Sequence, residues 1–213
     1  VTPQGFHGFI LAAGQTVYVD PYAEGDIDNY ITYDKRDFTG RAAPWVCLVD
    51  AGPQPRGRVP DSPAVLPLSH GTELRTYRLA LAATGEYTAA AGGTKLAAMA
   101  RMTTSMNRVN GIYERDLTIR MTFVANNDLI IYTDAATDPY SNNSGGTMLA
   151  QNQPNLDAVI GDANYDIGHV FSTGGGGIAG LGVPCRAGLK ARGVTGSSNP
   201  TGDPFDVDFV AHE

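Results

Sequence analysis

Basic residues, cysteine and long apolar runs are all scarce in this chain, and each scarcity excludes a class of protein. The 213 residues carry 15 Lys and Arg against 22 Asp and Glu, for a net charge of −7, and no basic cluster is longer than Lys35-Arg36. Because nucleic-acid binding requires a basic patch, we expect no nucleic-acid partner. No stretch of the sequence approaches the roughly 18 apolar residues of a membrane span, so we expect no such span.

Cysteine is too rare to define the redox compartment. Cys47 and Cys185 are the two present. They could pair with each other, pair with residues outside this chain, or stay free. Richness in Gly, Asn, Ser and Thr with only three Lys favours a secreted or cell-surface protein. The chain starts at Val1 without an initiator Met, and we expect processing to have trimmed both ends.

The first part of the chain, residues 1–51, is rich in strand signals. Two alternating runs, 8–11 and 16–20, flank a Gly-containing turn and predict a hairpin. Short strands are predicted at 30–33 and, as a buried apolar run, at 45–49. Five prolines then fall within 52–71, which predicts an extended linker and places a domain boundary there.

From residue 72 the pattern changes to α/β. Residues 74–81 and 117–124 alternate with period two, as strands do. Between them, apolar residues recur at spacings of three and four, which predicts a helix that starts at the N-cap Thr94 and ends near Gly111. Strand, helix and strand in this order predict a right-handed βαβ unit with parallel strands.

The stretch that follows mixes loops with short elements. Residues 126–143 hold seven Asp and Asn around a short predicted strand at 129–132. Such a loop is a candidate Ca²⁺ site, although it lacks EF-hand spacing and these residues are also common in turns. A short helix at 153–160, a strand at 167–172 and a glycine-rich connector at 174–177 are predicted next.

The last two residues carry the sharpest chemical signal. An apolar segment that opens with Asp203-Pro204, a helix-start signal, ends in His212-Glu213. These are the first two letters of the helical zinc signature H-E-x-x-H, in which a second His follows one turn later. We therefore interpret the chain as stopping inside this motif, two turns into a helix. The alternative is an accidental pair on a surface helix.

Residues 73–213, about two-thirds of the chain, resemble the catalytic domain of bacterial reprolysin-like (adamalysin-type) metalloproteases of the metzincin clan. The resemblance is carried by four places: 77–81 with the helix containing 107–113, the strand 164–171, the segment 178–185, and 209–213. It implies an α/β fold: a twisted, mostly parallel sheet with an antiparallel edge strand and two or three helices. The β-rich residues 1–51 would be a propeptide-like segment, 52–71 a linker, and 72–213 a catalytic domain truncated at its C-terminus.

The resemblance also implies roles for individual residues. His212 would be the first Zn²⁺ ligand and Glu213 the catalytic base of a zinc endopeptidase. The strand Ile178, Ala179, Gly180, Leu181 and Gly182 would align a peptide or protein substrate by strand addition. Because the further ligands have no counterpart here, we expect this chain to hold no Zn²⁺ and to be inactive. His169 lies outside the motif and is not assigned to metal.

Several alternatives stay open at this point. The partner of Cys185 in the family would lie beyond this chain. Cys47 fits a buried structural cysteine, with a cysteine switch, a thiolate that silences zinc, as the alternative. The parent protein could also be a secreted pseudo-protease that only binds, or an extracellular adhesive module. The oligomeric state is not determined by the sequence.

Overall fold

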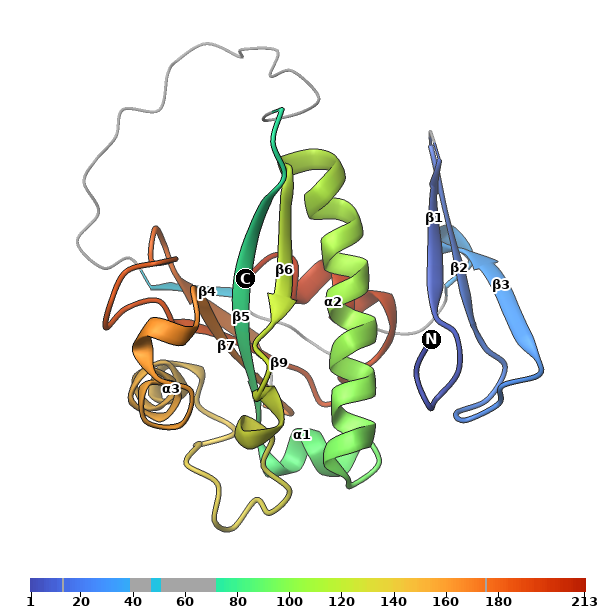
Figure 1. The fold of residues 1–213 in the computed structure, drawn as a ribbon. Helices are drawn as coiled ribbons and strands as arrows, with labels where there is room; N and C mark the ends of the chain where they lie inside the picture. The colour runs from blue at the N-terminus through green and yellow to red at the C-terminus, as the bar shows by residue number, and fades with distance from the viewer. Residues whose placement is uncertain (13, 39–46, 51–71, 175) are drawn as a thin grey trace.

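The structure, a computed structural model, describes residues 1–12, 14–38, 47–50, 72–174 and 176–213 (Figure 1). The linker predicted at 52–71 lies outside the described residues, so its extended form stays a prediction, as do the domain boundaries.

The centre of the molecule is a six-stranded sheet. Its order is β4-β8-β9-β7-β5-β6. Every neighbouring pair in it is parallel except the antiparallel pair of β8 and β9. The predicted α/β class with a mostly parallel sheet is therefore confirmed. The strands are β4 (Cys47–Asp50), β5 (Arg75–Ala83), β6 (Ile119–Phe123), β7 (Ile167–Ser172), β8 (Gly176–Gly180) and β9 (Gly193–Gly196).

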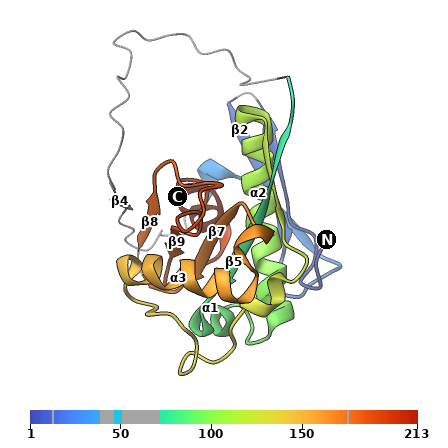
Figure 2. The same cartoon turned by 60° about the vertical axis from the view of Figure 1, so that its left-hand side comes forward.

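Helices cover both faces of this sheet, and β5 shows why. Its side chains alternate: Leu79, Leu81 and Ala83 belong to the core under helix α2 (Lys95–Leu117). Ala80 and Ala82 belong to the opposite core, under helix α3 (Gly145–Val159). A strand buried on both faces reads as a continuous apolar run, as the second half of β5 does. Figures 1 and 2 show α2 and α3 on opposite sides, with the short helix α1 (Gly85–Ala90) near the lower end of β5.

Helix α2 begins where the sequence predicts but runs further. The Thr94 hydroxyl accepts a hydrogen bond from the Ala97 N–H at 3.1 Å, as an N-cap does. The predicted end near Gly111 is wrong, since the helix continues to Leu117. Gly111 is instead a contact position, because an added Cβ would lie 2.8 Å from the ring of Phe9.

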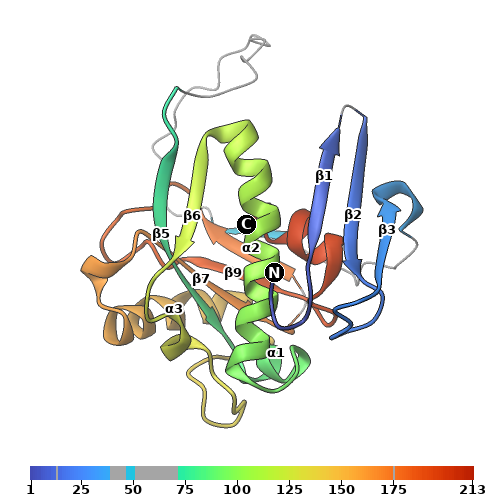
Figure 3. The same ribbon diagram turned by 45° about the vertical axis from the view of Figure 1, so that its right-hand side comes forward.

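A separate three-stranded antiparallel sheet lies on the other side of α2 (Figure 3). It consists of β1 (Gly8–Ala12), β2 (Gln15–Pro21) and β3 (Tyr30–Asp34), which confirms the predicted hairpin and third strand. Phe9, Tyr18 and Tyr33 are cross-strand neighbours whose rings stack at centroid distances of 6.2 and 5.4 Å. This aromatic row gives the small sheet an apolar face toward α2. A 3₁₀ turn, η1 (Lys35–Asp37), follows it.

Three local predictions are wrong. Residues 129–132 are mainly a 3₁₀ turn, η2 (Asn127–Ile130), and only Ile131 makes a β-bridge, to Ala83. Helix α3 begins at Gly145 and carries Pro154 inside it. Its packing through Met148, Leu149 and Leu156 outweighs the hydrogen bond that Pro154 removes. Gly176 and Gly177 of the expected connector are part of β8.

The 3₁₀ turn η2 is attached to the sheet by one buried amide. The Asn127 side chain accepts from the Leu81 N–H at 2.8 Å and donates to the Leu81 carbonyl at 2.9 Å. It thereby supplies the hydrogen bonds that a neighbouring strand would give.

We expect Asn127→Ala to lower the free energy of unfolding by about 3 kcal/mol, because two buried backbone groups lose their partner. Asn126→Ala is the matched control: the Asn126 side chain makes no capping hydrogen bond, and a change within about 0.5 kcal/mol is expected. Urea unfolding of both variants measures the difference, and equal losses would contradict the assignment.

Candidate functional site

The segment that ends in His212-Glu213 starts as a helix of unusual winding. Pro204–Phe209 forms a π-helical turn, η4. The Val210 N–H donates to the Phe205 carbonyl at 2.9 Å, five residues back. His212 and Glu213 follow in a turn, and both of their N–H groups donate to the Phe209 carbonyl. The predicted helix is therefore present at Pro204–Phe209, with π winding, but His212 and Glu213 lie after it and not within it. Asp203 does not cap the segment with its side chain either.

Apolar side chains fix this segment on the face of the sheet that α2 covers. Phe205 is fully buried and meets the ring of Phe171 on β7 edge to face, at 5.1 Å between centroids. Phe209 and Val210 belong to the same core. The Tyr113 hydroxyl of α2 donates to the Ala211 carbonyl at 2.7 Å, one residue before His212. The position of His212-Glu213 thus follows from the packing of the segment before it.

The Glu213 carboxylate lies against the backbone of β8. A Cβ added to Gly177 would fall 2.4 Å from Glu213 Oε1 and 2.7 Å from its Cγ. A larger residue at position 177 would require the Glu213 side chain to shift. The structure therefore brings the predicted catalytic base together with the strand predicted to bind substrate. Sequence reasoning missed Gly177, although a glycine inside a strand is a known signal of close backbone approach.

The predicted substrate strand is shifted and is not outermost. Ile178, Ala179 and Gly180 lie in β8, whereas Leu181 and Gly182 lie in the turn after it. The far side of β8 is paired in parallel with β4, so that Leu48, Val49 and Asp50 stand opposite Ile178, Ala179 and Gly180. The edge that a substrate would use is occupied by the chain's own earlier segment. Substrate binding by these five residues stays a prediction.

His169 lies on β7, beside the site but with its own partner. Its Nε2 is 2.8 Å from the Thr195 hydroxyl. Burial lowers the pKa of its imidazole to about 4, so the ring is neutral at physiological pH. It lines an apolar cavity of about 270 Å³ between α2 and the sheet, and Glu213 and Val210 line the same cavity. This setting agrees with a structural residue outside the metal motif.

The acidic loop does not support the Ca²⁺ prediction. Asp138 accepts from the Gly85 N–H at the start of α1 and from the Tyr140 N–H, and Asp134 accepts from the Ala136 N–H. Asn142 binds Thr84 and Thr173. The oxygens of this loop thus serve its own turns and caps.

We asked next whether the residues present fit a Zn²⁺ ion. Among the described residues, no group of three or more His, Cys, Asp or Glu side chains converges on a point that could hold a metal. His212 supplies one nitrogen donor, whereas zinc sites in proteins take three or four protein ligands. The described residues alone therefore do not fit the ion.

The described chain is thus an α/β domain whose terminal His-Glu pair lies beside a strand of its sheet. The profile of the metallo-peptidase family M12B, reprolysin-like, matches residues 73–213. The chain belongs to this family of peptidases, as the resemblance predicts. No curated protein matches it. None of the described helices is both long and apolar enough to cross a membrane.

We expect Gly177→Ala to lower the free energy of unfolding by about 1 kcal/mol, because its methyl group requires the Glu213 side chain to move. Truncating the acid in Gly177→Ala/Glu213→Ala should recover most of the loss. Gly146→Ala on α3, where a Cβ meets nothing within 4 Å, is the control and should not destabilise. Thermal unfolding checks all three, and a loss that persists without Glu213 would refute the contact.

Proposed function

We propose that the parent protein is a zinc-dependent endopeptidase in which His212 is the first metal ligand and Glu213 is the general base. The observation that carries the proposal is the contact between Glu213 and Gly177, which sets a carboxylate next to a strand able to align a peptide. Membership in the reprolysin-like family supports the reaction class. Zinc, when bound by three protein ligands, lowers the pKa of its water toward 7.

In this proposal the other zinc ligands come from sequence that these 213 residues do not contain, so this chain is itself inactive. Peptides bind along β8, where main-chain hydrogen bonds give affinity and Ile178, Ala179 and Gly180 line the path. The protein acts at the cell surface or in secretion, as its composition suggests. The rival, a secreted pseudo-protease that binds peptides without cleaving them, shares the strand and the His212-Glu213 pair but lacks the remaining zinc ligands.

We expect the 213-residue chain to hold far less than one Zn²⁺ per molecule and the full-length gene product to hold one. In the full-length protein, Glu213→Gln should keep zinc and lower kcat by roughly 10²–10⁴-fold, because only the base is removed. His212→Ala should lose the metal. His169→Gln, which retains a partner for Thr195, is the control that keeps zinc. Elemental analysis and cleavage of a peptide library measure these outcomes, and full activity in Glu213→Gln would exclude the proposed base.

We also propose that residues 1–50 keep the enzyme latent. The supporting observation is β4, which takes the backbone hydrogen-bonding groups of β8 that a substrate would need. The backbone register sets Cys47 opposite Gly177, the residue that contacts Glu213. In this proposal Cys47 is a cysteine switch whose thiolate binds zinc in the latent form.

We expect Cys47→Ser to raise the activity of the unprocessed full-length protein at least tenfold, because a hydroxyl is a much poorer zinc ligand than a thiolate. Cys47→His, which keeps a side chain able to bind zinc, is the matched control and should stay latent. A fluorogenic peptide assay on intact protein, with the chain length verified by mass spectrometry, gives the comparison. Equal activities would leave β4 as a simple structural strand.

A further inference from the structure

The small N-terminal sheet contacts η4, the turn that leads to His212-Glu213, through charged groups. Asp203 is only 2% exposed, and its carboxylate accepts a hydrogen bond from the Tyr18 hydroxyl of β2. Lys35, just after β3, lies 3.1 Å from Asp203 and 3.0 Å from Asp208. The acidic start of the terminal segment is thus bound to residues of the N-terminal sheet and of the turn after it.

Arg108 of α2 connects the two units from between them. Its Nη1 donates to Asp206 of η4 at 2.7 Å, and its Nη2 donates to Asp20 of β2 at 2.6 Å. The guanidinium is buried, at 3% exposure, and lies 5.1 Å from the centre of the Tyr18 ring. Ser105, one turn earlier on α2, donates to the other oxygen of Asp206 at 2.5 Å. One buried cation therefore holds a carboxylate from each unit.

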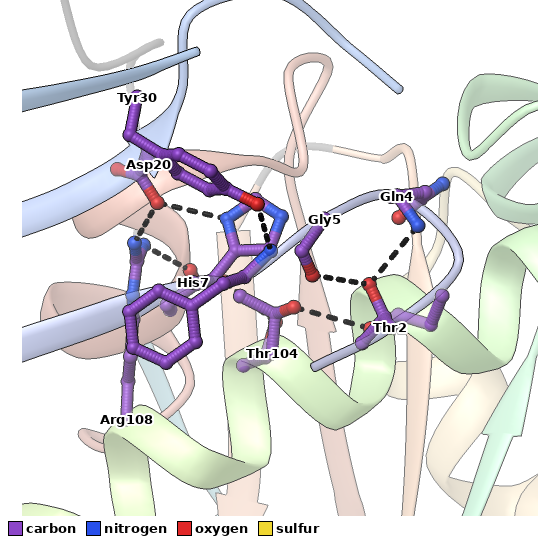
Figure 4. A network of polar contacts seen from close by, with 12 residues as sticks. Thr2, Gln4, Gly5, His7, Asp20, Tyr30, Thr104 and Arg108 are labelled. Carbon is purple, nitrogen blue, oxygen red and sulfur yellow. Dashed lines mark hydrogen bonds and ion pairs between the residues drawn. The ribbon is translucent and has the colours of Figure 1, made fainter. Parts of the chain in front are cut away.

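Asp20 is itself well held on its own sheet. Figure 4 shows it between His7 and Arg108, and His7 Nδ1 lies 2.8 Å from its Oδ1. The Tyr33 hydroxyl donates to its Oδ2 at 2.7 Å. Burial would raise the pKa of Asp20, but the hydrogen bond to His7, the charge of Arg108 and the bond from Tyr33 together hold it below its usual value. Asp20 is therefore ionised and preorganised to pair with Arg108.

This arrangement bears on the winding of η4. A π turn is rare and is retained only where its surroundings impose it. The Val210-to-Phe205 hydrogen bond of the turn encloses Asp206, so the residue held by Arg108 lies inside the unusual turn. Winding by four instead of five residues would rotate His212 and Glu213 relative to Asp206. Contacts that fix Asp203 and Asp206 consequently fix the direction in which the last two side chains face.

We propose that the N-terminal sheet is a positioning element for His212 and Glu213, which acts through Asp20, Arg108 and Asp206 by holding Pro204–Phe209 in π-helical winding. The catalytic significance of this coupling rests on the proposed function, but the coupling itself needs neither zinc nor substrate. This coupling differs from the pairing of β4 with β8, because it acts through α2 and η4 and leaves the edge of β8 unaffected.

Amide hydrogen exchange of the 213-residue chain tests the coupling directly. In Asp20→Asn, which leaves Arg108 with one charged partner, we expect the amides of Val210, His212 and Glu213 to exchange roughly tenfold faster, while β5 and β7 keep their rates. Asp20→Glu should restore slow exchange. Tyr18→Phe, a milder change that removes the hydroxyl from Asp203 but keeps the ring over Arg108, should give a smaller acceleration at the same amides.

The matched control is Glu24→Gln, which breaks the ion pair of Glu24 with Arg101 of α2, a contact that does not involve η4, and should leave the terminal amides unchanged. Unaltered exchange at 210–213 in both Asp20→Asn and Tyr18→Phe would overturn the proposal. An acceleration spread evenly over β5, β7 and η4 would also overturn it, since that indicates loss of global stability. Hydrogen exchange does not depend on zinc or on cleavage. If the full-length Glu213→Gln enzyme stays active, the proposed function is refuted but the coupling proposed here is not.

Discussion

The buried guanidinium of Arg108 is the interaction on which the relation between the two sheets depends. An ion of this size out of water is stable only when its charge is matched. The two carboxylates that match it, through Nη1 and Nη2, come from opposite ends of the sequence, Asp20 and Asp206. Helix α2 consequently has two different partners. Its apolar stripe, with Met102, Met106 and Val109, is part of the core of the main sheet, and its polar face joins the N-terminal sheet to η4.

Two segments of the N-terminal region contact the candidate site from different directions, one through main-chain hydrogen bonds and the other through charged side chains. Strand β4 pairs with β8 through main-chain hydrogen bonds, which are indifferent to side-chain identity. The β1–β3 sheet is linked to η4 through Asp20, the buried Arg108 of α2 and Asp206, charge pairs that depend on particular side chains. Glu213 lies between these two contacts: its side chain is against Gly177 of β8, and its backbone follows η4. The proposed base, Glu213, is thus located by contacts that separate segments of the chain supply.

The features that the sequence predicts correctly are those set by residues close together in the chain. The βαβ unit follows from period two and period 3.6 around the Thr94 cap, and the hairpin follows from alternation around a glycine turn. The features that were missed depend on groups distant in sequence. Gly111 lies inside the helix, where Phe9 packs on it. The Asp203 side chain does not cap η4, because its oxygens bind Tyr18 and Lys35. The Asp203-Pro204 pair does mark the start of a helix, but this signal does not distinguish π-helical from α-helical winding. Arg108 lies next to Val109 of the apolar stripe, but nothing in the sequence identifies Asp20 and Asp206 as its partners.

The two N-terminal contacts also differ in what they exclude. The outward hydrogen-bonding groups of β8 can pair with one strand at a time, so β4 and a peptide substrate are alternatives. The charge network of Arg108 occupies none of these groups and lies across α2 from the sheet. Under the proposed function, β4 has to leave before a peptide can add to β8, whereas the β1–β3 sheet does not. The edge of β8 can then be freed while Arg108 still holds η4, and with it the turn that carries the proposed metal ligand and the proposed base.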